Sequence, residues 1–424
     1  MMKTNITMLK FLLPLIFILI DWYFFSGVQT LIKDFSPQRK VTIQSVYWVI
    51  SALTIFCLLV TGVFSQASLP SFFRGYIVSI LFIIFLSKFL GCIFLLVDDI
   101  LRLFRWGYQF ATTINIPEKR VGISRLKFLT YASGTIFGLS FASFFYGLVK
   151  GAHNYKVFNV KLNFKNLPEA FSGLKIAQIS DIHTGSFSDT EALAQAFDML
   201  MELKPDIIFF TGDLVNDKTT ETEGFLSIYQ KLKAPMGVFS VLGNHDYGDY
   251  SEWQSRQAKA ENLEALKKVH AQAGWRLLMN EHVTLEKNGQ QIALLGIENW
   301  GGNLNFPKYG RMDLAYAGTE KFEFKMLLSH DPSHWDKQVK KQYPDIDITF
   351  SGHTHGAQFG IEIPGLRWSP SKYFYKQWAG LYNNKNQYLY VNRGLGCVGR
   401  ERVAAYNGRL GIWPEITLME LTKG

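Results

Sequence analysis

Five short clusters of Asp, His and Asn residues are the part of this 424-residue sequence that could do chemistry. The clusters read SDIHTG from Ser180, TGDLVND from Thr211, LGNHDYG from Leu242, LSHDP from Leu328 and SGHTHG from Ser351. Carboxylate, imidazole and amide ligands suit Mn, Fe or Zn better than soft cysteine sites or all-oxygen sites do. A carboxylate such as Asp213 can bridge two ions about 3.5–4 Å apart, the spacing of two-metal hydrolases. The clusters therefore indicate a site with enough ligands for two metal ions.

No single cluster is specific for a metal site. A lone Asp-x-His, or a lone histidine at a strand end, is more often a cap or a surface group, and Gly-Asn-His-Asp alone could be a turn. However, all five clusters are present in this chain, and each directly follows an apolar run. This favours one shared site. The histidines that lack such a setting are interpreted as surface or locally bonded residues, and they are His153, His270, His282 and His334.

Short apolar runs rich in β-branched and aromatic residues precede the clusters and predict strands. The runs are KVFNVKLNF, LKIAQIS, PDIIFFTG, GVFSVLG, QIALLGI, FKMLLSH, DIDITFSG and QYLYVNRG. Residues 188–204 and 253–273 have the apolar spacing of helices. Interposed strands and helices predict an α/β layered fold, and ligands gather beyond the carboxyl ends of strands in open sheets. From the residues alone we expect an open parallel sheet whose strand ends converge on one site.

The ordered motif set resembles that of the calcineurin-like metallophosphoesterase family over roughly residues 155–424. With the apolar N-terminal third, the chain is most similar to membrane-anchored bacterial members and to transmembrane proteins with a metallophosphoesterase domain. The resemblance implies a two-sheet β-sandwich flanked by helices, an α/β (α+β) fold, in place of the open sheet. It also implies two divalent metal ions, with Mn, Fe or Zn as the candidates. The implied activity is hydrolysis of a phosphodiester, phosphomonoester or pyrophosphate bond at the membrane by a hydroxide that the two metals activate.

The same resemblance implies roles for individual residues. The implied ligands are Asp181, His183, Asp213 and His355 for one metal, and Asp213 as a bridge with Asn244, His330 and His353 for the other. His245 would be a catalytic acid or charge stabiliser near the leaving oxygen, and Asp246 would orient it.

The sequence departs from the family pattern in two places. Ala357 stands where relatives commonly have a second glycine, and alanine is unfavourable there if the backbone needs a positive φ. The stretch from Gly396 onward is atypical, and Arg393, Arg400 and Arg402 could reach a phosphate there. Solvated surface arginine is the alternative for the last two.

The N-terminal third has the composition of a membrane domain. Residues 1–150 contain 14 Lys and Arg against 5 Asp and Glu, so they carry the whole net charge of +9. Four apolar runs are near the ~20 residues that a membrane-spanning helix needs, and they cover about 8–29, 45–65, 76–97 and 126–149. We therefore expect a transmembrane domain over 1–150 and a metallophosphoesterase domain over 155–424.

Two ionisable residues, Asp21 and Lys88, lie inside the first and third apolar runs. An isolated charge is costly in the bilayer, and the two residues lie at similar depths in helices that run in the same direction. We predict an Asp21–Lys88 ion pair, with a functional polar site as the alternative.

Flanking basic residues predict the orientation of the chain in the membrane. The loops at 30–44 and 98–125, with Lys127, carry nine Lys and Arg, whereas the N-terminus and the 66–75 loop carry three. The richer side is expected in the cytoplasm, which places the catalytic domain outside it.

The expected partners are the membrane and a phosphorylated substrate, for which a lipid-linked phosphate is one candidate. No nucleic-acid binding is predicted, because residues 151–424 carry 30 Lys and Arg against 30 Asp and Glu. The alternative function is a non-catalytic, membrane-anchored sensor or scaffold for a phosphate ligand. A charged fraction of 19% and only three Cys exclude a disordered chain and a disulfide scaffold.

Overall fold

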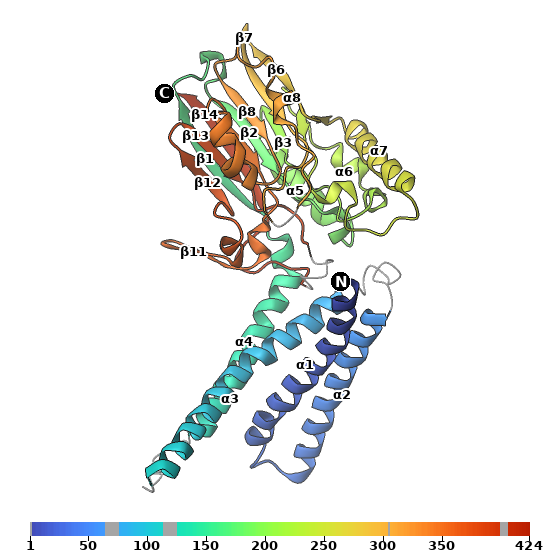
Figure 1. Ribbon diagram of the computed structural model, residues 1–424, viewed down its shortest axis with the longest axis vertical. Coiled ribbons are helices and arrows are strands. Elements are labelled where there is room, and N and C mark those ends of the chain that lie inside the picture. Colours follow the sequence, from blue (N-terminus) through green and yellow to red (C-terminus); the bar gives the residue numbers. More distant parts are fainter. Residues whose placement is uncertain (1, 64–75, 113–124, 304–305, 399–405) are drawn as a thin grey trace. The chain divides into compact units, whose positions relative to one another are not determined.

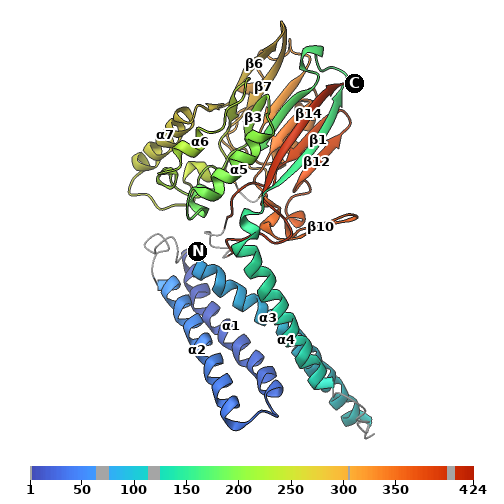
Figure 2. The same cartoon turned by 180° about the vertical axis from the view of Figure 1, so that it is seen from behind.

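The computed structural model describes residues 2–63, 76–112, 125–303, 306–398 and 406–424 (Figure 1, Figure 2). The chain divides into two compact units. Met1–Leu148 make up most of the first unit, and Val149–Glu401 with Asn407–Gly424 make up the second. Some of the basic residues discussed above lie outside the described residues, namely Arg74, Lys119, Arg120, Arg400 and Arg402.

The described part of the first unit contains four helices that are long and apolar enough to cross a membrane. They are α1 (Met2–Leu31), α2 (Pro37–Val63), α3 (Val78–Thr112) and α4 (Arg125–Val149). Helix α3 continues to Thr112, which corrects the loop expected from residue 98. Arg102 lies one turn beyond Asp98, with 2.6 Å between Nη2 and Oδ2, and such pairing supports the helix past the apolar run.

The predicted ion pair is confirmed in the first unit. Nζ of Lys88 on α3 donates to Oδ1 of Asp21 on α1 over 2.6 Å, and both side chains are 5% exposed. The same ammonium donates to Oγ of Ser51 on α2 over 3.1 Å. The pair therefore ties three helices together through charges that would be costly alone in an apolar environment.

The second unit is built on two six-stranded sheets. The first sheet has the order β1-β14-β2-β3-β4-β5, and the second has the order β12-β13-β9-β8-β7-β6. The strands of the first sheet are β1 (Lys156–Phe164), β14 (Glu415–Lys423), β2 (Leu174–Ile179), β3 (Ile207–Phe210), β4 (Val238–Ser240) and β5 (Arg276–Leu277). Those of the second are β12 (Gly380–Asn384), β13 (Gln387–Val391), β9 (Ile348–Ser351), β8 (Lys325–Leu328), β7 (Gln290–Gly296) and β6 (Glu281–Lys287). A separate two-stranded ribbon consists of β10 (Ile361–Ile363) and β11 (Leu366–Trp368).

Both sheets are mixed. Strands β2, β3 and β4 are parallel, as are β7, β8, β9 and β13. Strand β14 pairs in parallel with β1, from Lys156 opposite Glu415 to Phe164 opposite Lys423, and antiparallel with β2. The carboxyl ends of the parallel strands in each sheet are the places where the five clusters occur.

Apolar side chains of the two sheets form a common core. Ile176, Phe209, Leu294 and Phe350 belong to this core, and the rings of Phe209 and Phe350 meet edge to face with centroids 5.0 Å apart. Helices cover the outer faces, with α5 (Glu191–Glu202), α6 (Leu226–Tyr229) and α7 (Arg256–Gln272) on the first sheet and α8 (Met312–Tyr316) on the second. The fold is thus the flanked two-sheet sandwich, and the open sheet expected from the residues alone is wrong, because a second sheet buries the inner face of the first.

Short helical segments complete the second unit. They are η3 (Gly151–His153), η4 (Glu169–Phe171), η5 (Thr184–Ser186), η6 (Thr219–Thr222), η7 (His245–Tyr247), η8 (Trp335–Val339), α9 (Lys340–Gln342), η9 (His355–Gln358) and η10 (Pro370–Tyr373). Three of them, η5, η7 and η9, begin at or directly after a residue of the polar clusters.

Candidate metal centre

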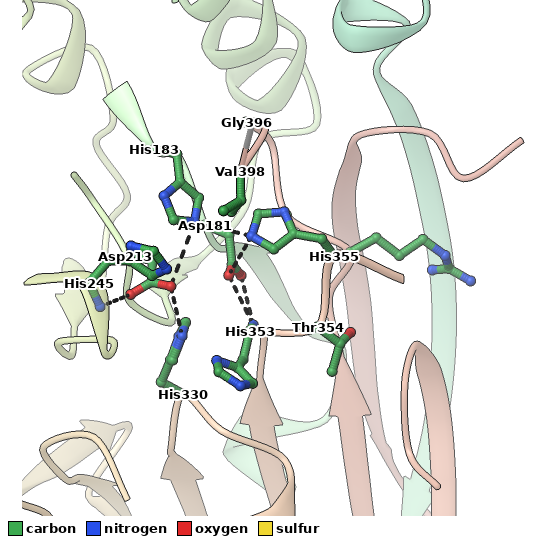
Figure 3. Close-up of polar contacts among 12 residues, drawn as sticks. Asp181, His183, Asp213, His245, His330, His353, Thr354, His355, Gly396 and Val398 are labelled. Carbon is green, nitrogen blue, oxygen red and sulfur yellow. Dashed lines mark hydrogen bonds and ion pairs between the residues drawn. The ribbon is translucent and has the colours of Figure 1, made fainter. Parts of the chain in front are cut away.

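The five polar clusters meet at one place in the second unit (Figure 3). Asp181 follows β2, Asp213 follows β3, and Asn244 follows β4 in the first sheet. His330 follows β8 and His353 follows β9 in the second sheet. Because the ends of both sheets face the same site, residues as distant in sequence as Asp181 and His353 are neighbours.

Asp181, His183 and His355 form one group of ligands. Nε2 of His183 and Nε2 of His355 are 3.1 Å apart, and Nε2 of His355 is 3.2 Å from Oδ1 of Asp181. The backbone N–H of His353 lies 3.0 Å from both carboxylate oxygens of Asp181 and donates to them. All three side chains are buried, so their nitrogen and oxygen atoms point at one another inside the protein.

Asp213, His330 and His353 form a second group. Oδ2 of Asp213 is 3.0 Å from Nε2 of His330 and 3.6 Å from Nε2 of His183, so this carboxylate reaches both groups. Nδ1–H of His330 donates to the carbonyl of Thr211 over 2.7 Å, which directs Nε2 toward the site. Oδ1 of Asn244 is 2.7 Å from Nδ1 of His353.

The donor set fits divalent cations. Each group offers buried carboxylate and imidazole atoms within 4.8 Å of one another, which is the ligand chemistry of Mn, Fe and Zn. A carbonyl fixes the outer nitrogen of His330, as is usual for a metal-binding imidazole. Asp213 is a carboxylate that lies close to histidines of both groups.

The backbone of the site is strained. The φ angles are +50° at Asp181, +47° at His183, +61° at Asp213, +75° at His353 and +49° at His355, although none of these residues is glycine. Each such residue costs roughly 1–2 kcal/mol, and strain of this kind persists at functional sites. Sharp left-handed turns directly after the strands aim the side chains into the site.

Ala357 also has a positive φ, of +52°. The position therefore has the backbone conformation for which glycine is preferred, and the departure from the family pattern carries a conformational cost there. Ala357 lies in the short turn His355–Gln358, so the strain belongs to the loop that begins at His355.

Burial and neighbouring charges set the pKa values of the ligands. Burial lowers the pKa of His183, His353 and His355, which keeps these imidazoles neutral. Burial opposes the charge of Asp213, but His330 and His245 outweigh this effect and hold the pKa of Asp213 well below its usual value. Burial lowers the pKa of His330, but the nearby carboxylate of Asp213 outweighs this effect, and the pKa of His330 is raised to about 10.

His245 lies beside the first group, and its ring centroid is 4.8 Å from that of His183. Nδ1–H of His245 donates to the carbonyl of Asn216 over 2.7 Å. Asp246 was expected to orient His245, whereas its carboxylate accepts from the backbone N–H groups of Gly243, Asp213 and Leu214 over 2.8–2.9 Å. Asp246 therefore holds the backbone around the ligands, and the carbonyl of Asn216 holds the His245 ring. Burial and nearby Asp213 raise the pKa of Asp246 to about 7.

Three further residues contact the ligands and were missed in the sequence. The hydroxyl of Tyr375 is 2.7 Å from Nε2 of His353, and Nδ2 of Asn244 donates to the hydroxyl of Tyr250 over 2.9 Å. Nη2 of the fully buried Arg409 donates to Nδ1 of His355 over 3.2 Å. No local sequence signal marks these residues, because each reaches the site through the path of a loop.

Arg393 is one of the three arginines that the sequence suggests as contacts for a phosphate. Its guanidinium instead forms ion pairs with Glu415 and with Oε1 of Glu362, the latter over 2.5 Å, and its side chain is 3% exposed. The charge of Arg393 is therefore neutralised within the protein. Its role is structural, because the pairs connect β14 with the ribbon strand β10.

Two family models match this chain. Residues 5–152 match the model described as "Probable Calcineurin-like phosphoesterase, transmembrane domain", and residues 174–357 match "Calcineurin-like phosphoesterase". The two matches agree with the division into a helical membrane unit and a two-sheet unit that carries the ligand groups.

Three proteins from other organisms illustrate what this chain is similar to. A "Transmembrane protein with metallophosphoesterase domain" from Danio rerio is 30% identical over 260 residues, which are 60% of this chain and 56% of that protein. "UDP-2,3-diacylglucosamine pyrophosphatase LpxG" from Chlamydia trachomatis is 30% identical over 310 residues, 61% of this chain and 87% of that protein. "Phosphodiesterase YaeI" from Escherichia coli is 26% identical over 252 residues, 58% of this chain and 82% of that protein. The chain thus spans little more than half the length of the Danio rerio relative.

Proposed function

Since the chain belongs to the calcineurin-like phosphoesterase family, whose members are hydrolases with a divalent metal centre, we propose that it cleaves a phosphoester bond at the membrane with two bound ions. The observation that carries the proposal is that Oδ2 of Asp213 lies 3.6 Å from Nε2 of His183 in the first group and 3.0 Å from Nε2 of His330 in the second. The substrate would be a phosphodiester, a phosphomonoester or a pyrophosphate, and the ions would be Mn, Fe or Zn.

Each ligand has a part in holding the ions. When bound, the two ions would lower the pKa of a water molecule and offset the negative charge of the phosphoryl oxygens. We assign one ion to Asp181, His183, Asp213 and His355, and the other to Asp213, Asn244, His330 and His353. The buried loops, in which several ligands have a left-handed backbone conformation, keep these side chains in place before substrate arrives. Little reorganisation is then needed during the reaction.

His245 is the residue to which we assign the proton that the leaving oxygen needs. Its Nδ1–H is engaged with the carbonyl of Asn216, so Nε2 is the nitrogen whose protonation can change. A leaving alkoxide is stabilised when a positioned acid transfers a proton to it. Asp246 supports this step indirectly through the backbone of Gly243 and Asp213.

The test is hydrolysis by the full-length protein, purified in detergent and supplied with Mn, Fe or Zn in turn. Bis(p-nitrophenyl) phosphate, p-nitrophenyl phosphate and a pyrophosphate-linked nucleotide separate the three bond types. We expect metal-dependent turnover of at least one of them. Stoichiometric binding of metal and phosphate with no turnover of any substrate would favour the sensor or scaffold instead.

We also propose that the catalytic unit lies outside the cytoplasm. The support is the excess of basic residues in residues 30–44 and 98–127, which contain nine Lys and Arg, against three in the N-terminus and residues 66–75. A protease added to intact cells, with the outer membrane permeabilised if one exists, should cleave this unit. Cleavage only after the inner membrane is opened would place the unit in the cytoplasm.

A further inference from the structure

The β10–β11 ribbon presents an apolar face to solvent. Its register pairs Ile361 with Trp368 and Ile363 with Leu366, and these residues alternate with the Glu362–Arg367 pair. Because successive side chains of a strand point to opposite faces, the four apolar residues share one face. The exposed fractions are 44% for Ile361, 58% for Ile363 and 50% for Leu366.

The opposite face of the ribbon is fixed to the catalytic unit. Glu362 binds Nη2 of Arg393, which also pairs with Glu415 in the first sheet. Arg367 donates to the carbonyl of Ala379, and its guanidinium lies 4.6 Å from the Trp378 ring centroid. An isolated two-stranded ribbon is marginal in water, so these contacts hold the ribbon with its apolar face outward.

The next turn of the chain extends the apolar face. Tyr373 and Phe374 are 69% and 60% exposed, and the hydroxyl of Tyr373 is 3.5 Å from Nε1 of Trp368. Two exposed basic residues, Lys372 and Lys376, flank these aromatic rings. Exposed aliphatic and aromatic side chains beside lysines are the composition of a surface that binds a bilayer interface containing anionic lipids.

This segment is also connected to the metal centre. Oγ of Ser369 donates to the carbonyl of Gly356 over 2.6 Å, directly after the expected ligand His355. Tyr375, the residue after Phe374, contacts Nε2 of His353 through its hydroxyl. Hydrogen bonds therefore join the segment that carries the apolar surface to the loop that carries His353 and His355.

The chain itself keeps the catalytic unit close to a bilayer. Helix α4, a candidate membrane span, ends at Val149, and β1 of the catalytic unit begins at Lys156. Only residues 150–155 connect the two. At ~3.5 Å per residue, such a connection covers no more than about 25 Å. A bilayer is thus always within reach of the catalytic unit, whichever side that unit occupies.

We propose that Ile361, Ile363, Leu366, Tyr373 and Phe374 form a membrane-docking surface that inserts into the lipid interface. Lys372 and Lys376 contact anionic head groups there. Docking holds the metal centre at head-group level, so the substrate class it favours is a phosphate ester or pyrophosphate carried by a lipid in the same bilayer. This preference for lipid substrates rests on the proposed function, whereas the docking itself does not.

The docking is tested by photo-crosslinking of the full-length protein in nanodiscs that contain anionic phospholipid. Benzoylphenylalanine replaces Ile363 or Phe374 in two variants, and it replaces Leu314 in the control. Leu314 is 53% exposed on α8 of the same unit and lies outside the docking surface. We expect lipid adducts from the first two positions and at least tenfold fewer from the control. Equal adduct yields at all three positions, or adducts only to protein, would overturn the proposal.

The substrate preference is tested by kinetics in the same nanodiscs. The double variant Ile363→Ser, Leu366→Ser should lower turnover of a lipid-borne phosphodiester at least tenfold and leave a water-soluble chromogenic phosphodiester within twofold of wild type. Leu314→Ser should change neither rate. Equal loss on both substrates would show that the surface is merely structural. Inactivity of the wild type on every substrate would refute the proposed function and leave the crosslinking result standing.

Discussion

The backbone N–H of His245 donates a 2.9 Å hydrogen bond to Oδ1 of Asp213, so the proposed acid and the proposed bridging ligand are joined directly. The other oxygen of Asp213 faces His330. Because the bond uses the main chain of His245, replacement of the His245 side chain leaves Asp213 in position. Metal binding and proton transfer can therefore be separated by mutation.

Asp213→Asn should abolish turnover and weaken metal binding, because a neutral amide cannot offset the charge of two cations. His245→Ala should lower turnover by about 10²–10⁴-fold and retain both metals. The loss should be smallest for substrates with acidic leaving groups, which need no proton. Elemental analysis and initial rates give the two readouts. Loss of metal from His245→Ala with full loading of Asp213→Asn would reverse the two assignments.

Metal binding should release a proton near neutral pH. In the metal-free protein Asp213 raises the pKa of His330 to about 10, so His330 is protonated at pH 7.5. A metal ligand must offer a lone pair, so occupancy of the second group displaces this proton. In calorimetric titration with Mn in buffers of different ionisation enthalpy, the total proton release should therefore include about one proton from His330. His330→Asn should bind more weakly and release about one proton fewer than wild type, and an unchanged total would exclude His330 as a source.

Lys88→Met should destabilise the first unit. The change leaves Asp21 buried without its partner, and an unpaired buried charge costs about 3–5 kcal/mol. Unfolding in mixed micelles by added sodium dodecyl sulfate measures the loss. The double variant Asp21→Asn, Lys88→Met removes both charges and should recover most of the stability. A single variant as stable as wild type would mean that the pair does not stabilise the helices.

His270 should make the catalytic unit sensitive to acid. This histidine of α7 is fully buried, Oγ of Ser240 lies 3.0 Å from its Nδ1, and burial lowers its pKa to about 3. The unfolded chain has the ordinary value near 6.5, so it takes up the proton first as the pH falls. Stability is then lost below about pH 6.5, by about 1.4 kcal/mol per pH unit.

The readout for His270 is the fluorescence of the protein during denaturation at pH 5 and pH 7. Trp275 is a useful reporter, because it is 3% exposed and its ring lies 5.6 Å from that of His270. The His270→Phe variant should lose about 2 kcal/mol less between the two pH values than wild type does. His153→Phe serves as a comparison at a less deeply buried histidine. Identical pH slopes for wild type and His270→Phe would contradict this account.

The sequence predicted those parts of the fold that depend on local signals. KVFNVKLNF coincides with β1, and the ligand-bearing turns follow β2, β3, β4, β8 and β9 as expected. Such strands are recognisable because an apolar run ends in Gly, Asp or His. The matching depths of Asp21 and Lys88 predicted their pairing, because an isolated charge in an apolar helix needs a partner.

Other features depend on contacts between distant segments. The pairing of β1 with β14 joins residues such as Lys161 and Glu420, which are 259 positions apart, and no local pattern encodes it. The contacts of Tyr375 and Arg409 with the ligand histidines likewise arise from loop paths. The adjacency of Asp246 to His245 in sequence did not indicate that its carboxylate accepts hydrogen bonds from the backbone N–H groups of Gly243 and Asp213.

Strand β14 occupies the position between β1 and β2, although it follows every other described strand in the chain. As the ribosome synthesises the chain, β1 and β2 emerge with no strand between them. About 250 residues separate β1 from β14, and at ~5–20 residues per second their synthesis takes roughly 10–50 s. The sheet that carries Asp181 and Asp213 is complete only when this last strand has arrived. Completion of the sheet that carries Asp181 and Asp213 is therefore a late step of biogenesis, and it takes place in the compartment that receives β14.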